Sequence, residues 1–317
     1  MKIRLESSPL VFDPIYIEKP WGGSKLTGEK GIGEAFLISD LTGASTRCLG
    51  KSVQELFLHY GEEFFGKELT AKHGGNLPIY LKELDAADNL SVQVHPDNKF
   101  AKDLENEPFG KNEAWYILEA TKGAGLYLGL KEGVSETILR NALAHKDDVS
   151  ELMNFVPVCA GSFFYLPAGL LHALGKGVRL LEPQQNSNTT YRVWDWNRVD
   201  EKGAPRELHI EKALKVINFD SSFNGQYSKA ILLKKNLFLD GEYFKVEYFS
   251  LRNEEMVLKR KSLLGFIVPI KGSLEVRFDG LENKPVMPGK ACLIPAFVHN
   301  VVLSTGVSAD CLFITPK

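Results

Sequence analysis

The sequence predicts a mainly β protein with two jelly-roll-like β-barrel units and a small helical insertion. Short apolar runs recur along all 317 residues, separated by turns that contain glycine, proline or charged residues. This pattern is typical of antiparallel sandwiches and barrels rather than of a parallel α/β sheet. Gly161 and Pro167 are separated by five residues, and so are Gly289 and Pro295. The repeat indicates two copies of one architecture.

The N-terminal part of the chain should supply several strands and one helix. Residues 9–23 mix apolar residues with prolines and end in Trp-Gly-Gly, which indicates an edge strand running into a turn. Ser52, followed three residues later by Glu55, is a capping-box pattern, so a helix is predicted over about 53–60. Further strands in this part are expected at 31–39 and 77–86.

A change of hydrophobic period marks the helical insertion, which we place near 132–155. An apolar stripe with helical spacing runs through it, formed by Ile138, Leu139, Ala142 and Leu143. A second short helix is expected over 149–153. The first domain should therefore span 1–225 and carry both the insertion and the candidate site, and the second should span 226–317.

Strands resume after the insertion. The segment 189–198 alternates, so Arg192, Trp194 and Trp196 should point one way and Asp195 the other. Residues 207–218 have helical spacing and should bridge to the second domain. The remaining strands are expected within 157–169, 178–185, 244–251, 263–278 and 290–303.

Composition and charge argue against several classes of function. The formal net charge of −2 gives no reason to expect nucleic acid or an anionic membrane as a partner. No apolar segment reaches the roughly 18 residues of a membrane span, and charges interrupt the N-terminus where a signal peptide needs an apolar run. The four cysteines are scattered, which favours a reduced cytoplasmic protein. We expect a monomer or a weak homodimer.

Two strands near the middle of the chain, and one turn, carry a candidate site. Gln93 and His95 lie two residues apart, as do Lys111 and Glu113, so each pair shares one face of an extended strand. His172 follows an apolar strand and a Pro-x-Gly turn. Two imidazoles, one carboxylate and one amide oxygen suit a divalent transition metal, with zinc the leading choice.

The simpler interpretation is that these polar residues alternate on half-exposed strands and bind nothing. A single histidine is more often a structural residue than a ligand. We assign that structural role to His59, His73, His145 and His209.

Several ordered motifs are shared with one known family. They are Gln93-Val-His95-Pro-Asp97, Gly110-Lys-Asn-Glu113-Ala-Trp-Tyr, Pro167-Ala-Gly-Leu-Leu-His172 and Gln184-Gln-Asn-Ser-Asn-Thr-Thr-Tyr-Arg192-Val-Trp-Asp. Together they resemble type I mannose-6-phosphate isomerases of the cupin superfamily, most closely the short bacterial form. Trp21-Gly-Gly and Ile32-Gly-Glu look like that family's N-terminal motifs, so the resemblance spans most of the chain.

The resemblance implies two cupin-like units and a zinc-dependent isomerase (EC 5.3.1.8) that interconverts mannose 6-phosphate and fructose 6-phosphate. It implies Arg192 as the catalytic arginine, and Ser91 and Lys111 as the residues that bind the phosphate of the sugar phosphate substrate. It implies one Zn²⁺ per chain, with the ligands Gln93, His95, Glu113 and His172.

The second unit departs from this pattern. Pro295 to His299 is one residue shorter than Pro167 to His172, and no partner ligands precede it. We therefore expect a structural His299 and no metal in the second unit.

The implied reaction moves a proton between C2 and C1 through a cis-enediol, so the barrier lies in making an enediolate. Arg192 stays protonated at any working pH and can stabilise the developing oxyanion or hold the substrate. Its structural alternative is a salt bridge on a strand. The base is left open among Asp195, Glu182, Lys111 and a metal-bound hydroxide.

Two other functions fit part of the pattern. A cupin dioxygenase using Fe(II) would share the His/Glu/His site without requiring Lys111 or Arg192 near it. A non-catalytic sugar-binding protein on the same barrel would be favoured by loss of a ligand or of Arg192, and none is lost.

Overall fold

A computed structural model describes residues 8–199, 202–261, 263–278 and 281–317; the charged N-terminal residues 1–7 lie outside them. The described chain is mainly β, as the sequence predicted. None of its helices is long and apolar enough to cross a membrane.

The chain divides into two compact units, each assembled from separate stretches. Unit 1 comprises Met1–Ile17, Ala35–Glu83 and Leu232–Lys317, and unit 2 comprises Glu18–Glu34 and Leu84–Ile231. The chain passes between the units within three strands: β2 (Ile15–Gly23), β3 (Ile32–Ile38) and β6 (Ile79–Asp85). The expected division of function between 1–225 and 226–317 stays a prediction.

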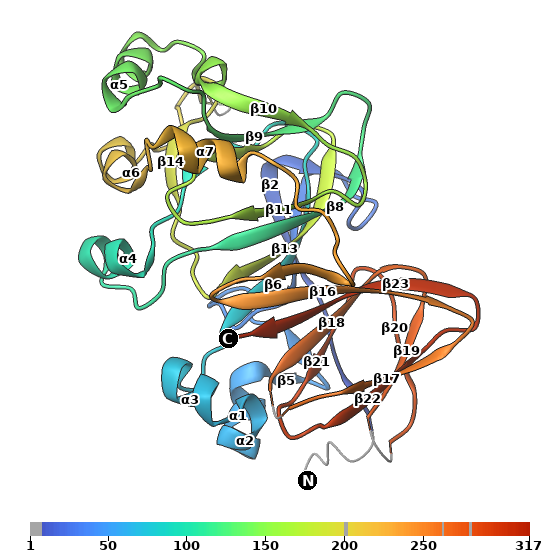
Figure 1. Ribbon diagram of the computed structural model, residues 1–317. Helices are drawn as coiled ribbons and strands as arrows, with labels where there is room; N and C mark the ends of the chain where they lie inside the picture. Colours follow the sequence, from blue (N-terminus) through green and yellow to red (C-terminus); the bar gives the residue numbers. More distant parts are fainter. Residues whose placement is uncertain (1–7, 200–201, 262, 279–280) are drawn as a thin grey trace. The chain divides into compact units, whose positions relative to one another are not determined.

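Unit 1 contains two antiparallel sheets, with the strand orders β1-β21-β18-β23-β16-β15 and β17-β22-β19-β20 (Figure 1). Their bounds are β1 Leu10–Phe12, β15 Leu237–Asp240, β16 Phe244–Arg252, β17 Glu255–Lys259, β18 Gly265–Lys271, β19 Leu274–Phe278, β20 Lys284–Val286, β21 Ala291–Ile294, β22 Asn300–Ser304 and β23 Ser308–Pro316. Apolar residues from both sheets, such as Ile267 of β18 and Leu303 of β22, form one core. Each sheet has two edge strands, so these described strands do not close into a barrel.

The helices of unit 1 begin at the predicted capping box. Helix α1 (Val53–Tyr60) starts after Ser52, whose side chain accepts from Glu55 N at 3.2 Å. The Glu55 carboxylate accepts from Ser52 N at 2.7 Å. The backbone N–H groups of Ser52 and Glu55, which have no partner within the helix, are therefore both hydrogen-bonded. Helices α2 (Glu62–Phe65) and α3 (Lys67–His73) follow, after the short strands β4 (Arg47–Cys48) and β5 (Lys51–Ser52).

Unit 2 places two sheets around the candidate site. One has the order β10-β9-β12-β7-β14, and in the other β8 lies between β11 and β13 (Figure 1). Their bounds are β7 Val92–Val94, β8 Glu113–Ala120, β9 Gly125–Leu130, β10 Met153–Pro157, β11 Phe163–Leu166, β12 His172–Leu174, β13 Val178–Gln185 and β14 Tyr191–Trp194. Leu128 and Leu174 from the first sheet share a core with Trp115 and Leu180 from the second. The faces of the two sheets that carry these residues are the inner faces.

The outer face of the first sheet packs against helices. Val92, Val94 and Val193 form a second core there with Leu214 of α6 and Leu139 of α5. The helical elements are α4 Asn98–Glu105, α5 Glu136–His145, the 3₁₀ helix η2 Val149–Leu152, α6 Ile210–Val216 and α7 Ser221–Tyr227. The predicted insertion is therefore confirmed by α5 and η2, although its last residues belong to β10.

The strand predicted over 189–198 is wrong beyond Trp194. The register shifts between Arg192 and Trp194, and β14 ends there. Trp196 and Asn197 have positive φ angles of 58° and 52°, which breaks the alternation. The reason is a turn that begins a hairpin in which Val199 pairs with Pro205, rather than a continuing strand.

The predicted repeat appears as the same local structure in both units. Gly161 and Gly289 have φ angles of 88° and 83°, and a four-residue strand follows each of them. The next strand begins at His172 in unit 2 and at Asn300 in unit 1. Asn300 therefore occupies the position of His172, and His299 is an exposed neighbour.

Candidate metal centre

Three neighbouring strands bring polar side chains onto one rung of the first sheet of unit 2. Gln93 of β7 pairs with His172 of β12 on one side and with Arg192 of β14 on the other. Directly paired residues point to the same face of a sheet. His172 also pairs with Leu128, whose side chain is in the inner core, so this rung points inward.

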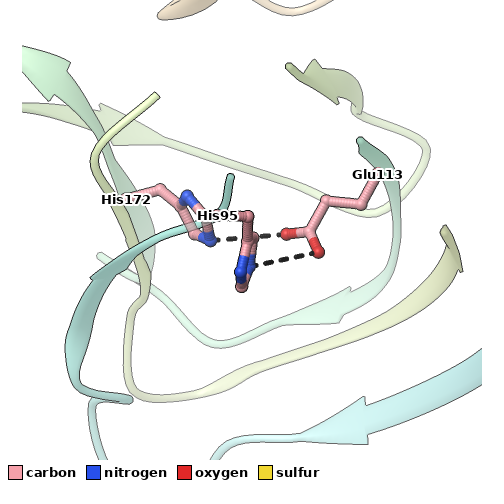
Figure 2. Close-up of side chains that lie close together, drawn as sticks. All are labelled: His95, Glu113 and His172. Atoms are coloured by element: carbon pink, nitrogen blue, oxygen red, sulfur yellow. Dashed lines mark ion pairs between the residues drawn. The ribbon is translucent and has the colours of Figure 1, made fainter. Parts of the chain in front are cut away.

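Glu113 reaches the same point from the facing sheet, as the first residue of β8. His95, Glu113 and His172 are buried, and one ligand atom of each lies within 4.8 Å of the others. Glu113 Oε2 is 3.5 Å from His95 Nε2, and Glu113 Oε1 is 3.4 Å from His172 Nε2. Figure 2 shows the three side chains converging.

Backbone carbonyls orient both imidazoles. His95 Nδ1 lies 2.9 Å from Thr189 O, and His172 Nδ1 lies 2.8 Å from Leu170 O. A carbonyl can only accept, so each Nδ1 carries a proton and the Nε2 of each ring is directed toward Glu113. Burial lowers the pKa of His172 to about 4, which keeps that ring neutral.

The donor set fits a divalent metal ion. Glu113 Oε1 and His172 Nε2 are buried, face each other and have no hydrogen-bond partner. A lone pair opposite a carboxylate in a buried site is unfavourable unless a cation lies between them. Two Nε2 atoms and one carboxylate, with each ring oriented by a backbone carbonyl on its other nitrogen, are typical of zinc and other transition-metal sites.

Lys111 supplies part of the positive charge. Its Nζ lies 2.8 Å from Glu113 Oε2, 3.1 Å from His95 Nε2 and 4.0 Å from Glu182 Oε1. Burial alone would lower the pKa of Lys111, but the charges of Glu113 and Glu182 outweigh it and raise that pKa. The ammonium therefore sits beside the cluster, close to where a metal would bind.

Glu182 and Trp115 form a layer behind the cluster. Trp115 Nε1 donates to Glu182 Oε2 at 3.0 Å, and the Trp115 ring meets the His172 ring edge to face with centroids 5.4 Å apart. Asn112 fixes the turn before His172, because its side-chain oxygen accepts from Ala168 N at 3.0 Å. These contacts limit how far the two rings can move.

Ser91 directly precedes β7, and the side chain of Arg192, which pairs with Gln93, reaches it. Arg192 Nε donates to Ser91 Oγ at 3.2 Å, and Arg192 Nη1 donates to Glu207 O at 2.8 Å. Burial and the charge of Arg206 lower the pKa of Arg192. No described carboxylate pairs with the Arg192 guanidinium, so it is not held by the salt bridge that was its structural alternative.

The structure therefore brings most of the predicted site residues together. His95, Glu113, His172 and Lys111 form one cluster, Gln93 shares its sheet face, and Ser91 and Arg192 lie beside it. Sequence reasoning did not find Arg206, which follows the hairpin after β14. No spacing signal marks Arg206, because that hairpin and its cross-strand pair are not visible in the sequence.

Comparisons with known proteins agree with this geometry. Residues 13–123 match the model of the phosphomannose isomerase type I catalytic domain. A mannose-6-phosphate isomerase from Streptococcus mutans is 35% identical over 304 residues, covering 91% of this chain and 93% of that protein.

Solved structures extend the comparison to the fold. The Bacillus subtilis mannose 6-phosphate isomerase has a TM-score of 0.82 and 28% identity, covering 98% of this chain and all of that one. A mannose 6-phosphate isomerase solved with zinc and yttrium bound shares the fold, with a TM-score of 0.76 and 17% identity over 98% of this chain and 100% of that one.

Proposed function

The chain belongs to the mannose-6-phosphate isomerase family, and we propose that it catalyses this isomerisation at the His95, Glu113 and His172 cluster with one bound Zn²⁺. The substrates would be mannose 6-phosphate and fructose 6-phosphate. The observation that carries the proposal is the buried pair of Glu113 Oε1 and His172 Nε2, which face each other without a hydrogen-bond partner. Gln93 would complete the ligand set from the same sheet face.

Zinc is favoured over other metals by the donor types. Two imidazoles, one carboxylate and one amide oxygen leave the ion a net positive charge and match its usual ligands. When bound, zinc would act as a Lewis acid that stabilises negative charge on the oxygens at C1 and C2 of the sugar. The zinc-bound isomerase of the same fold supports this choice by analogy.

The protein's own residues would bind and orient the sugar around that ion. Arg192 carries a permanent positive charge at the inner face and would stabilise the enediolate oxygen or hold the substrate. Ser91 and Lys111 are the proposed substrate-binding residues. Lys111 lies beside Glu113, so its contact would be near the reacting carbons, whereas Ser91 lies on the Arg192 side.

The reaction needs a base that carries the proton between C2 and C1. Lys111 Nζ and Glu182 Oε1 are 4.0 Å apart beside the cluster, so a proton would pass between them through a bridging water or through the substrate. Asp195 is less suitable as a base, because Arg198 Nη2 already donates to its Oδ1 at 2.6 Å. We propose that the general base is one member of the Lys111 and Glu182 pair.

The finer architecture is also a proposal. The two-sheet units and the repeated turn and strand after Gly161 and Gly289 support two cupin-like jelly-roll units. We propose that only the unit containing His172 binds metal, because Asn300 takes its place in the other. A cytoplasmic monomer or weak homodimer is proposed from the sequence alone.

Turnover of mannose 6-phosphate is the direct test. Fructose 6-phosphate formation should be measured in a coupled assay with the zinc-loaded protein, and glucose 6-phosphate serves as the control substrate. Turnover of mannose 6-phosphate alone is expected. A zinc-loaded, folded protein without turnover would contradict the proposal and favour a sugar-binding role.

A further inference from the structure

Two arginines lie close to one buried carboxylate after β14. Asp195 Oδ1 accepts from Arg198 Nη2 at 2.6 Å and lies 3.5 Å from Arg206 Nη1. Val199 pairs with Pro205 in an antiparallel bridge, which brings the flanking residues Arg198 and Arg206 side by side. The side chains of both arginines are partly exposed, at 24% and 34%, so both remain accessible to a ligand.

Arg198 is fully engaged within the protein. Besides Asp195, its Nη1 contacts Asp88 Oδ2 at 3.2 Å and donates to Asn89 O at 2.7 Å. Asp195 thus has a close cationic partner in Arg198. Among the described residues, the 3.5 Å contact with Asp195 is the ion pair that Arg206 makes, so these residues compensate its charge only weakly.

Arg192 is the second weakly compensated cation. Its two hydrogen bonds go to neutral acceptors, Ser91 Oγ and Glu207 O, and no described carboxylate pairs with it. The Glu207 carboxylate is 85% exposed, so solvent screens its charge. Burial, and after it the like charge of Arg206, lower the pKa of Arg192.

The position of this pair suits the far end of a sugar phosphate. Ser91 directly precedes β7, two residues before Gln93, so in extended backbone the two lie about 6.6 Å apart on one face. Gln93 pairs with His172 of the metal cluster. A hexose with C1 and C2 at the cluster would therefore extend its C6 phosphate toward Ser91 and the arginines.

We propose that Arg206, together with Arg192 and Ser91, binds the phosphate of the sugar phosphate substrate. Two guanidinium groups and one hydroxyl supply the charge-assisted donors that a phosphate prefers. This inference rests on the proposed isomerase function. The competing explanation is that Arg206 only neutralises Asp195.

Arg206→Gln and Arg206→Lys test the inference, with Arg140→Gln as a matched control. Arg140 is also a partly exposed, ion-paired arginine, but it pairs with Glu136 and Glu211 on the helices. We expect Arg206→Gln to weaken kcat/KM for mannose 6-phosphate and binding of inorganic phosphate by about tenfold or more. Residual turnover of unphosphorylated mannose should stay within about twofold, and lysine should restore part of the loss. Unchanged phosphate binding in Arg206→Gln would overturn the inference.

The same variant in an Asp195→Asn background separates binding from charge neutralisation. If Arg206 binds phosphate, Arg206→Gln still weakens phosphate binding when Asp195→Asn has removed the carboxylate. If it only neutralises Asp195, the effect vanishes there, and the inference fails. Phosphate binding is measured calorimetrically without turnover. A wild-type protein that binds phosphate through Arg206 but does not isomerise the sugar would refute the proposed function alone.

Discussion

Trp115 Nε1 donates a hydrogen bond of 3.0 Å to Glu182 Oε2, which joins β8 to β13 beside the cluster of His95, Glu113 and His172. Trp115→Phe keeps an aromatic ring against His172 but removes the indole N–H that donates to the buried Glu182 oxygen. We expect a loss of about 1–3 kcal/mol in the free energy of unfolding, measured by denaturant titration. Trp194→Phe is the matched control, because Trp194 Nε1 donates to the exposed Asn197 at 3.3 Å. Equal losses in both variants would show that ring packing, not the Glu182 bond, matters.

Metal removal should abolish turnover and also lower stability. Dialysis against a strong chelator leaves Glu113 Oε1 and His172 Nε2 facing each other without a cation, so the melting temperature of the apoprotein should fall. Zinc should restore both the activity and the melting temperature. Glu113→Ala should weaken zinc binding more than Gln93→Ala, because it removes the only anionic ligand. Full activity in a preparation shown to be metal-free would refute the metal role.

A contribution of Arg192 to the enediolate, in addition to the proposed contact with the phosphate, would appear in kcat. Arg192→Ala should lower kcat more than it raises KM, with a loss of about 10²–10³ in kcat by analogy with oxyanion-hole deletions. Its contacts with Ser91 and Glu207 go to neutral atoms, so the loss should not arise from a broken ion pair. A variant with wild-type kcat and a raised KM would confine Arg192 to substrate binding, and one with both constants unchanged would return it to a structural role.

The Lys111→Ala variant tests whether Lys111 contacts the phosphate or acts near the reacting carbons of the sugar. Its Nζ lies 2.8 Å from Glu113, so Lys111→Ala should lower kcat/KM for mannose 6-phosphate and for mannose by similar factors. Parallel steady-state assays on the two sugars measure this ratio. A loss confined to mannose 6-phosphate would instead support the phosphate role expected from the sequence.

Unlike Lys111→Ala, Ser91→Ala should affect only the phosphorylated sugar. Ser91→Ala removes one neutral donor beside Arg192 and should cost about 1 kcal/mol, or roughly fivefold, in kcat/KM. The effect should appear with mannose 6-phosphate and be absent with mannose. If both sugars lose activity equally, Ser91 positions Arg192 rather than the phosphate.

Local signals were predictable from the sequence, and pairings between distant strands were not. The capping box at Ser52 and the helical stripe around Leu139 depend on neighbouring residues, and both predicted their helices. The shared face of Gln93 and His95 follows from strand geometry alone. The pairing of Gln93 with His172 is set by tertiary packing across many residues, so only the family resemblance suggested it.

The end of β14 shows why Arg206 could not be predicted from the sequence. The alternation from Arg192 to Trp196 is a valid strand pattern. Trp196 nevertheless adopts a left-handed backbone conformation, which is uncommon for tryptophan and is not predicted by the sequence. The hairpin that follows brings Arg206 beside Asp195, which no local spacing predicts. Charged residues held by loops are therefore the part of this site that the structure adds.

The interleaved sequence of the two units has a consequence for synthesis on the ribosome. All of unit 2 has been synthesised once the ribosome reaches Ile231. Unit 1 is complete only when Leu232–Lys317 has joined the earlier stretch Ala35–Glu83. Its first strand β1 must also wait for β21, with which Leu10 pairs through Leu293. Because domains fold as units while the chain is made, the half with the metal cluster can fold first. The part of Ala35–Glu83 between β3 and β6, residues 39–78, can complete its packing within unit 1 only after Leu232–Lys317 has been synthesised.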